Sequence, residues 1–301
     1  MSVWVDNTRC SYFNSLDDFW GEIKSNAPSG ELSVKESAKL MDGSHYDSSF
    51  GGETTTANMP AEQLKDWLKC GWQEGYERAQ KSLKQVIIPP VQTIKRRGVW
   101  SNSGDDLSQD RLFAGQTDTC WRTTRKAQGI GPPRIRILVS VGANADLEGN
   151  KLFWRAAAAM PLADALVMSG YHVAIDAIQH SQSTYKGSKN TVLCVRLKEY
   201  TQPLNPAYIT GVLGYAGFFR RLIFLWFHHG GSDLVAYGSL GSSRSYTQAG
   251  EKVREWVRNG EDSLSLFVPN GVDSEKDANE WVKNAVETIE GKRPNTTLTE
   301  D

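Results

Sequence analysis

Basic and aromatic side chains are interspersed along residues 94–136. Nine lysines and arginines and four aspartates lie there, so the stretch carries a charge of +5 in a chain whose formal net charge is −1. Aromatic rings stack on bases and cationic groups bind phosphates, so this pattern is typical of a surface for an unpaired nucleic acid strand. The alternative is that these residues pack between two subdomains, with the arginine stems covering apolar surface.

The expected nucleic-acid contacts come from this stretch and from later loops. Within the stretch they are Lys95, Arg96, Arg97, Arg122, Arg125, Lys126 and Arg134 for phosphates, with Trp100 and Trp121 for stacking. The segment 181–190 adds Tyr185, Lys186 and Lys189, either as a finger over the strand or as an ordinary polar turn. Arg220 and Arg221 follow an expected helix, where they could bind phosphate or stabilise the helix C-terminus. Arg244 precedes a helix whose free N–H groups could hold an anion.

Catalytic and metal-binding patterns are weak in this sequence. Cys10, Cys70, Cys120 and Cys194 lie 50 to 74 residues apart, too far for a CxxC zinc or redox motif. An α/β enzyme could use His228, Asp233 and the serine-rich loop 237–246 on a phosphorylated small molecule, but no nucleophile motif accompanies them. We therefore expect a protein that is not an enzyme and holds no metal or cofactor, with His228 and His229 in structural roles.

Length and composition favour a folded cytoplasmic protein. A chain of 301 residues with 39% hydrophobic content can bury a substantial core. Its ten tryptophans exceed what is usual and suggest a stacking or interface role. No signal-peptide pattern opens the chain, and no apolar run approaches the ~18 residues of a membrane span. The longest such run, 222–227, is interpreted as a buried strand.

The first part of the chain, residues 1–93, is expected to be mostly helical. Ser15 and the apolar spacing after it predict a helix over 15–25. Residues 43–58 are rich in Gly, Ser and Thr, so we expect a flexible insert. Pro60 opens a second helix that should extend to about Gln85. Residues 94–133 then form a basic-aromatic connector, which begins in an extended segment.

From residue 134 to 290 the pattern alternates between strands and helices. Strands are expected at 134–142, 171–179, 191–200, 222–229 and 263–269, with helices at 152–168, 205–219, 246–258 and 274–289. Strands that are apolar on both faces belong in a sheet covered by helices on both sides. The fold class is therefore α/β with three layers, and residues 291–301 form a disordered tail that ends in acids.

The order of elements after Arg134 resembles the von Willebrand A-type fold. In that family the first strand ends in an Asp-x-Ser-x-Ser metal site, and here Ser140, Gly142 and Asn144 occupy the matching positions. Hard cations need several oxygen ligands, usually with a carboxylate. The resemblance therefore implies a degenerate, metal-free site, with Asp146 as the one nearby substitute.

The whole chain resembles a group of phage-encoded proteins without an assigned activity. The resemblance rests on GWQEG (71–75), GDDLSQDRLFAGQTDTCW (104–121) and RIRILVSVGANADLEG (134–149). Among phage proteins with such a fold, it is similar to single-stranded-DNA-binding cofactors that recruit a phage RNA polymerase to melted promoters. This implies a DNA-binding accessory protein of transcription or replication in the host cytoplasm. A protein adaptor that uses the top face of a metal-free A-domain is the alternative.

Overall fold

The chain forms two compact units. The computed structural model describes residues 2–28, 31–43, 59–83, 88, 90–91, 98–104, 106–124, 132–142, 149–182, 189–231, 242–258, 260–261 and 263–291. One unit, here the main unit, comprises Met1–Ile88 and Arg134–Asp301, and the other, the inserted unit, comprises Pro89–Pro133. Residues 1–93 were expected to form a region of their own, whereas residues 1–88 share the main unit with the second half of the chain.

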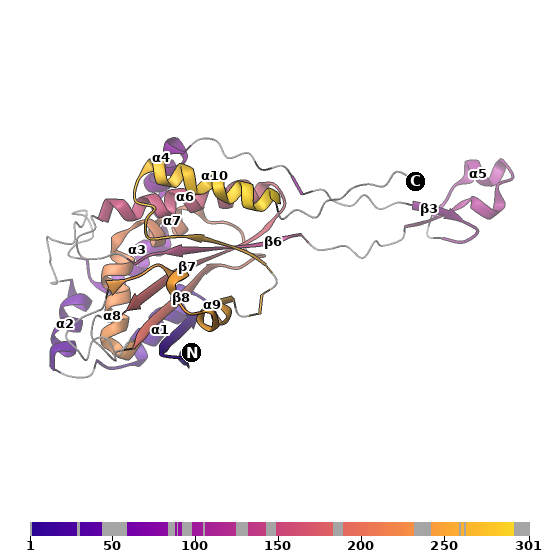
Figure 1. Cartoon of the computed structure of the whole chain (residues 1–301). Helices are drawn as coiled ribbons and strands as arrows, with labels where there is room; N and C mark the ends of the chain where they lie inside the picture. Colours follow the sequence, from indigo (N-terminus) through magenta and orange to yellow (C-terminus); the bar gives the residue numbers. More distant parts are fainter. Residues whose placement is uncertain are drawn as a thin grey trace. The chain divides into compact units, whose positions relative to one another are not determined.

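The main unit is built on one mixed sheet (Figure 1). The strand order is β1-β2-β8-β7-β6-β10, and β9 pairs with β7. β6 pairs in parallel with both β7 and β10, β2 pairs in parallel with β8, and β7 and β8 are antiparallel. The strands are β1 (Ser2–Val5), β2 (Thr8–Phe13), β6 (Arg134–Ser140), β7 (His172–Gln182), β8 (Asn190–Lys198), β9 (Ser242–Ser243) and β10 (Leu264–Val268).

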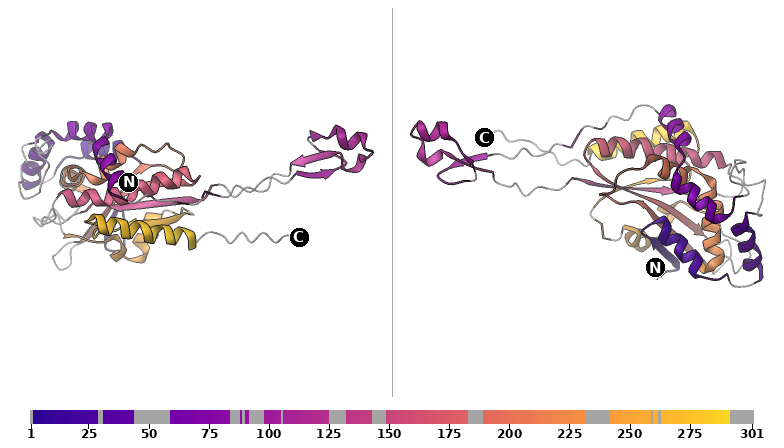
Figure 2. Two further views of the ribbon diagram at one scale, coloured as in Figure 1. Left: turned by 90° about the horizontal axis from the view of Figure 1, so that it is seen from above. Right: turned by 180° about the vertical axis from the view of Figure 1, so that it is seen from behind.

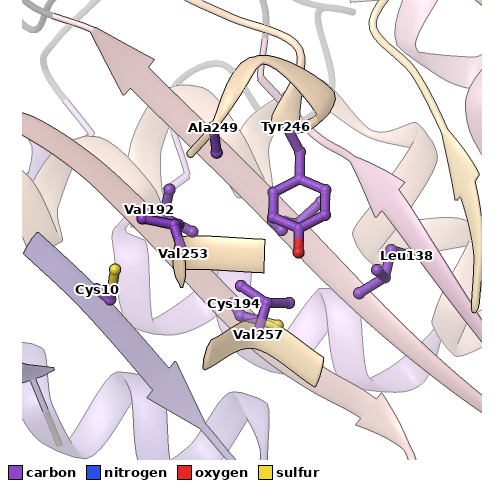
Figure 3. Packing of buried hydrophobic residues seen from close by; sticks show 9 residues of the cluster. Cys10, Leu138, Val192, Cys194, Tyr246, Ala249, Val253 and Val257 are labelled. Atoms are coloured by element: carbon purple, nitrogen blue, oxygen red, sulfur yellow. The ribbon is translucent and has the colours of Figure 1, made fainter. Parts of the chain in front are cut away.

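Helices cover both faces of this sheet (Figure 2). On one face, α6 (Gly149–Met168) packs against β6, β7 and β10 and is flanked by α7 (Pro206–Gly214) and α10 (Glu275–Gly291). On the other face, α9 (Glu251–Arg258) directs Val253 and Val257 into a cluster with Leu138, Val192 and Cys194 (Figure 3). The mixed α/β fold with helices packed on a central sheet is therefore confirmed.

The N-terminal part adds helices and two unforeseen strands. α1 (Leu16–Ser25) begins at the expected cap, where Ser15 Oγ accepts a hydrogen bond of 3.0 Å from the backbone N–H of Asp18. α2 (Glu31–Asp42) follows. β1 and β2 precede these helices and extend the sheet: β2 pairs with β8, and β1 pairs with β2 at the edge. The partner of β2 lies some 180 residues along the chain, so local pattern did not reveal this extension.

The apolar run 222–227 is helical, and its interpretation as a strand is wrong. π-helical turns at Phe218–Ile223 and Phe227–Gly231 enclose the short α8 (Phe224–Trp226). Gly230, with φ of 82°, lies outside helical backbone geometry at its end. An apolar run of this length fits a buried strand and a buried helix equally well, so its periodicity could not decide between them.

The helix expected from Pro60 to about Gln85 is two helices, α3 (Ala61–Cys70) and α4 (Gln73–Ser82). Gly71 interrupts it with φ of 88°. A Cβ there would lie 2.7 Å from the carbonyl carbon of Ala207, and the next backbone N–H, of Trp72, donates to Ala207 O at 2.8 Å. Gly75 lies directly beside the Trp72 ring, with no room for a Cβ. The GWQEG motif is thus a packing motif that seats α3 and α4 on α7.

No single helix among the described residues is long and apolar enough to cross a membrane. One bent pair, Pro206–Gly214 with Phe218–Gly230 at 60°, has the length and apolar composition of a span when its two helices are counted together. Most apolar side chains of this pair are buried inside the main unit.

The inserted unit is a small antiparallel sheet with one short helix. β3 (Gly98–Ser101), β5 (Trp121–Thr124) and β4 (Asp106–Leu107) pair in the order β3-β5-β4, and α5 (Gln109–Phe113) follows β4. Backbone bonds from Ser108 N to Cys120 O (2.8 Å) and from Gln116 N to Arg111 O (2.9 Å) close the loop between α5 and β5. Among the side chains described in this unit, Cys120 alone is buried.

Candidate nucleic-acid interface

Trp100, Arg111 and Arg122 converge on one face of the inserted unit. Trp100 and Arg122 are register partners on β3 and β5, and Arg122 is in turn the partner of Asp106 on β4. Partners across antiparallel strands share a face, so Trp100, Arg122 and Asp106 form one row across the sheet. The Cζ atom of Arg111 lies 4.2 Å from the centroid of the Trp100 ring, and that of Arg122 lies 5.9 Å from it. We call Trp100, Arg111 and Arg122 the Trp100 face.

Local bonds hold Arg111 over the ring. α5 begins at Ser108, whose Oγ accepts from the backbone N–H of Arg111 at 3.5 Å. The guanidinium Nη1 of Arg111 donates to Thr119 O at 3.2 Å. Arg111 was not among the expected contact residues, because only the loop between α5 and β5 brings it back to β3. Its place within the basic-aromatic stretch 94–136 and the motif 104–121 was the signal for it.

Trp121 lies on the opposite face of the same sheet. It pairs in register with Ser101 and Leu107, one position along from the row that contains Trp100. Successive strand residues point to opposite faces of the sheet. Trp100 and Trp121 therefore cannot both stack on bases of a strand that lies along one face. The expected joint surface of both tryptophans is therefore divided between two faces.

An apolar tip accompanies the Trp100 face. Phe113, at the end of α5, is 84% exposed, and its neighbour Leu112 is exposed as well. Trp100 itself is 37% exposed. The described part of the inserted unit thus leaves Trp100, Phe113 and Arg122 exposed and does not bury them in a core of its own.

The other expected contact residues are spread over the chain. Arg134 is exposed on the main unit, with its Cζ 5.4 Å from the Tyr200 ring. Lys189 and Arg244 are exposed, and the backbone N–H of Arg244 donates to His180 O at 2.9 Å. Seven residues lie outside the described part of the chain: Lys95, Arg96, Arg97, Arg125, Lys126, Tyr185 and Lys186.

Arg220 and Arg221 are buried, which differs from the expected exposed position at a helix end. They belong to a helical segment that continues into α8, so their side chains enter the interior. Arg221 Nη2 donates to Leu40 O on α2 at 2.9 Å, and burial lowers the pKa of Arg221. Side chains buried in this way are not accessible for contact with the phosphates of a nucleic acid.

Arg136, from the basic stretch, lies in a buried ion network of the main unit. Its guanidinium and that of Arg196 both hydrogen-bond the carboxylate of Asp176, which is completely buried. Arg196 Nη2 also donates to Glu261 at 3.0 Å. Burial raises the pKa of Asp176, and the two guanidinium groups counteract this increase. This part of the stretch therefore serves the core.

The expected degenerate metal site contains an arginine. Ser140 hydrogen-bonds Asn270, and the buried guanidinium of Arg155 donates to the carbonyls of Ser140 (3.2 Å), Gly142 (2.6 Å) and Asn270 (2.7 Å). It also reaches Asp273 Oδ1 at 3.1 Å. The guanidinium of Arg155 thus takes up the oxygen acceptors at the end of β6. Among the described residues no cluster of three or more His, Cys, Asp or Glu could hold a metal, and Asn144 and Asp146 lie outside them.

His229 joins three elements. Its Nδ1 donates to the carbonyls of Ile23 (2.7 Å) and Asn26 (2.6 Å) at the end of α1, and its Nε2 lies 2.6 Å from Ser37 Oγ on α2. His228 is buried. Asp233 and residues 237–241, the first half of the loop 237–246 in the enzymatic alternative, lie outside the described residues. The bonds of His229 are those of a side chain that anchors helices.

Comparison with known proteins yields a family without an assigned role. No curated protein and no solved structure matches this chain. A family described as a domain of unknown function, DUF7192, matches residues 5–292, which include the whole inserted unit and every strand of the main sheet except β1, of which only Val5 is matched. The protein therefore belongs to the DUF7192 family.

Proposed function

We propose that this protein binds single-stranded DNA through the Trp100 face and acts as a non-enzymatic accessory protein of a phage. The observation that carries the proposal is an exposed Trp100 ring with the guanidinium groups of Arg111 and Arg122 beside it. A ring in this setting can stack on a base, while the flanking cations meet the neighbouring phosphates.

The exposure of the Trp100 face supports binding over internal packing. In a small unit whose described side chains include a single buried residue, Cys120, stable packing would favour covering the tryptophan. Bases are open to stacking only where they are unpaired, so a ring that stacks on a base selects single strands over duplex. Most of the affinity then comes from phosphates, with little sequence readout.

A role in recruiting a phage RNA polymerase has separate support from the α5 tip. Exposed large apolar side chains such as Leu112 and Phe113 mark protein interaction sites. As the second candidate, we propose that the polymerase docks on this tip while the Trp100 face holds DNA. We also propose that the main unit has a fold of the von Willebrand A type. Replacement of Phe113 by Ser should abolish polymerase capture from nuclease-treated infected cells and leave DNA binding intact. Equal capture of the polymerase by the wild-type protein and the Phe113→Ser variant would exclude this docking site.

The DNA-binding proposal is tested by mobility shift with labelled single-stranded DNA, duplex DNA and RNA at two salt concentrations. If about five phosphates are contacted, raising salt from about 50 to about 200 mM should weaken single-strand binding roughly 100-fold. Arg122→Gln should lower the affinity and its salt dependence, while Lys283→Gln, an exposed change on α10, serves as the control. Equal affinity for duplex and single strand, or affinity that ignores salt, would contradict the proposal.

A further inference from the structure

The main unit has an aromatic-cation contact of its own, at the edge strand β1. Trp4 is 49% exposed there, and the Nζ atom of Lys189 lies 4.3 Å from the centroid of its ring. Trp4 is also the register partner of Arg9 on β2. A cation and an aromatic ring thus meet here with the same chemistry as in the inserted unit, at residues 185 positions apart in sequence.

Strand alternation explains why Trp4 points outward. Its neighbours Val3 and Val5 pack against the buried cluster under α9, so the residue between them faces the other way. The row continues from Trp4 to Arg9 and from Arg9 to Thr191 on β8. Lys189 precedes Thr191 by two positions and therefore lies on the same side.

The position of Lys189 is fixed by the sheet. The backbone N–H of Asn190 donates to Asn7 O at 3.0 Å, which joins the start of β8 to the turn between β1 and β2. The segment expected to act as a finger, 181–190, therefore ends beside Trp4. Sequence pattern alone placed these two residues in unrelated parts of the chain.

The side chains next to Trp4 on the strand pair are polar or charged. The carboxylate of Asp6, in the turn after β1, is bonded to Lys252 Nζ at 3.0 Å. The hydroxyls of Ser2 and Ser11, next in the strand pair, bond each other at 2.7 Å. The ring is thus flanked by the cationic side chains of Arg9 and Lys189. Among the described residues of the main unit, Trp4 is also the one exposed large aromatic side chain.

We propose that Trp4, Arg9 and Lys189 form a second contact for single-stranded nucleic acid. Trp4 stacks on one base, and the two cations bind the phosphates on either side. The inference shares its ligand class with the proposed function, but it rests on different residues in a different unit. Two contacts on one chain raise the affinity for a strand long enough to reach both, because the second binding step becomes intramolecular.

Photo-crosslinking tests this proposal on the full chain. An oligothymidylate of about 40 nucleotides, carrying bromodeoxyuridine, is long enough for several sites of roughly 4–16 nucleotides each. Irradiation followed by peptide mass spectrometry should place crosslinks at Trp4 as well as at Trp100. Crosslinks at Trp100 without Trp4 would overturn the second contact and leave the proposed function standing. Crosslinks at Trp4 alone would support the second contact and overturn the proposed function, and crosslinks at neither would overturn both.

Variants provide an independent measurement. Trp4→Ala and Lys189→Gln should each weaken binding of the long oligothymidylate about fivefold or more, whereas Trp4→Phe, which keeps a ring, should retain most of the affinity. Lys283→Gln again controls for a change of surface charge. Circular dichroism establishes that each variant is folded. The inference would be overturned if Lys189→Gln and Trp4→Ala left the dissociation constant for the long oligothymidylate unchanged.

Discussion

Trp100 and Trp121 occupy opposite faces of one small sheet, which makes them a matched pair for mutation. Trp100→Ala should weaken single-stranded DNA binding by about 5- to 150-fold, because stacking contributes roughly 1–3 kcal/mol per base. Trp121→Ala removes a ring of the same size from the face without Arg111 and Arg122, so its effect should stay within about twofold. Fluorescence anisotropy with a labelled oligonucleotide measures both. Equal losses from the two variants would show that the Trp100 face is not the binding surface.

Asp176 is the residue on which the buried ion network depends. Asp176→Asn keeps the shape but leaves the buried guanidinium groups of Arg136 and Arg196 without their counter-charge. Breaking a buried pair in this way costs about 3–5 kcal/mol of unfolding free energy. Urea denaturation measures the change.

The exposed pair between Lys24 and Glu62, at 3.0 Å, provides the control for that measurement. Glu62→Gln should change the free energy of unfolding by less than about 1 kcal/mol, because solvent screens exposed ion pairs. Similar losses for Asp176→Asn and Glu62→Gln would mean that the network contributes little to stability.

At the scale of elements, Gly71 decides how α3 and α4 sit on α7. Its φ of 88° is unfavourable for any residue with a Cβ, and that atom would also meet the backbone of Ala207 at 2.7 Å. Gly71→Ala should therefore destabilise the protein by more than the roughly 1–3 kcal/mol of the strained backbone conformation alone. Gly260→Ala, at a glycine with φ of 67° and open space around it, provides a control of positive φ without the close contact. Denaturation curves that coincide for the two variants would exclude the close contact as a cause.

His180, near the end of β7, should make stability depend on pH. Burial, with the nearby charge of Arg244, lowers the pKa of His180, although its bond to Ser245 O opposes this. The folded state then binds a proton less readily than the unfolded state. Its contribution is present above the ordinary pKa of about 6.5 and is lost as pH falls through the folded value.

His180→Gln should therefore flatten the fall in unfolding free energy between pH 7.5 and pH 5 that the wild-type protein shows. Urea midpoints at the two pH values measure this slope. A variant with the wild-type slope would assign the pH dependence to other groups.

At the scale of the whole molecule, the two units should be separable. The buried cluster under α9 and the core around α6 consist of residues from Met1–Ile88 and Arg134–Asp301. Replacing residues 98–124 by a short Gly/Ser linker should shift the thermal midpoint of the main unit by less than about 3 °C. The same variant should lose crosslinking at the Trp100 position. Calorimetry and crosslinking check the two expectations, and an unfolded main unit would contradict the first.

Local chemistry accounts for most of what could be predicted. The cap at Ser15, the β-branched strand of residues 134–140 and the helix over Leu152–Met168 each carry their signal within a few residues, because capping and side-chain periodicity act locally. The break at Gly71 was missed because its cause is the backbone of Ala207, which lies far along the chain. The run 222–227 was misread because burial on all sides removes the periodicity that separates a helix from a strand.

Residue types and their spacing determined that this chain has a folded α/β core and a basic-aromatic stretch, because both are local properties of the sequence. Tertiary structure decided how that stretch is used. Arg136 is buried in the core, and Trp100 and Trp121 lie on different faces of one sheet. Arg111 contacts Trp100, and Lys189 contacts Trp4. Strand pairing and loop closure join residues that are distant in sequence, so side-chain direction depends on a register that no local pattern contains.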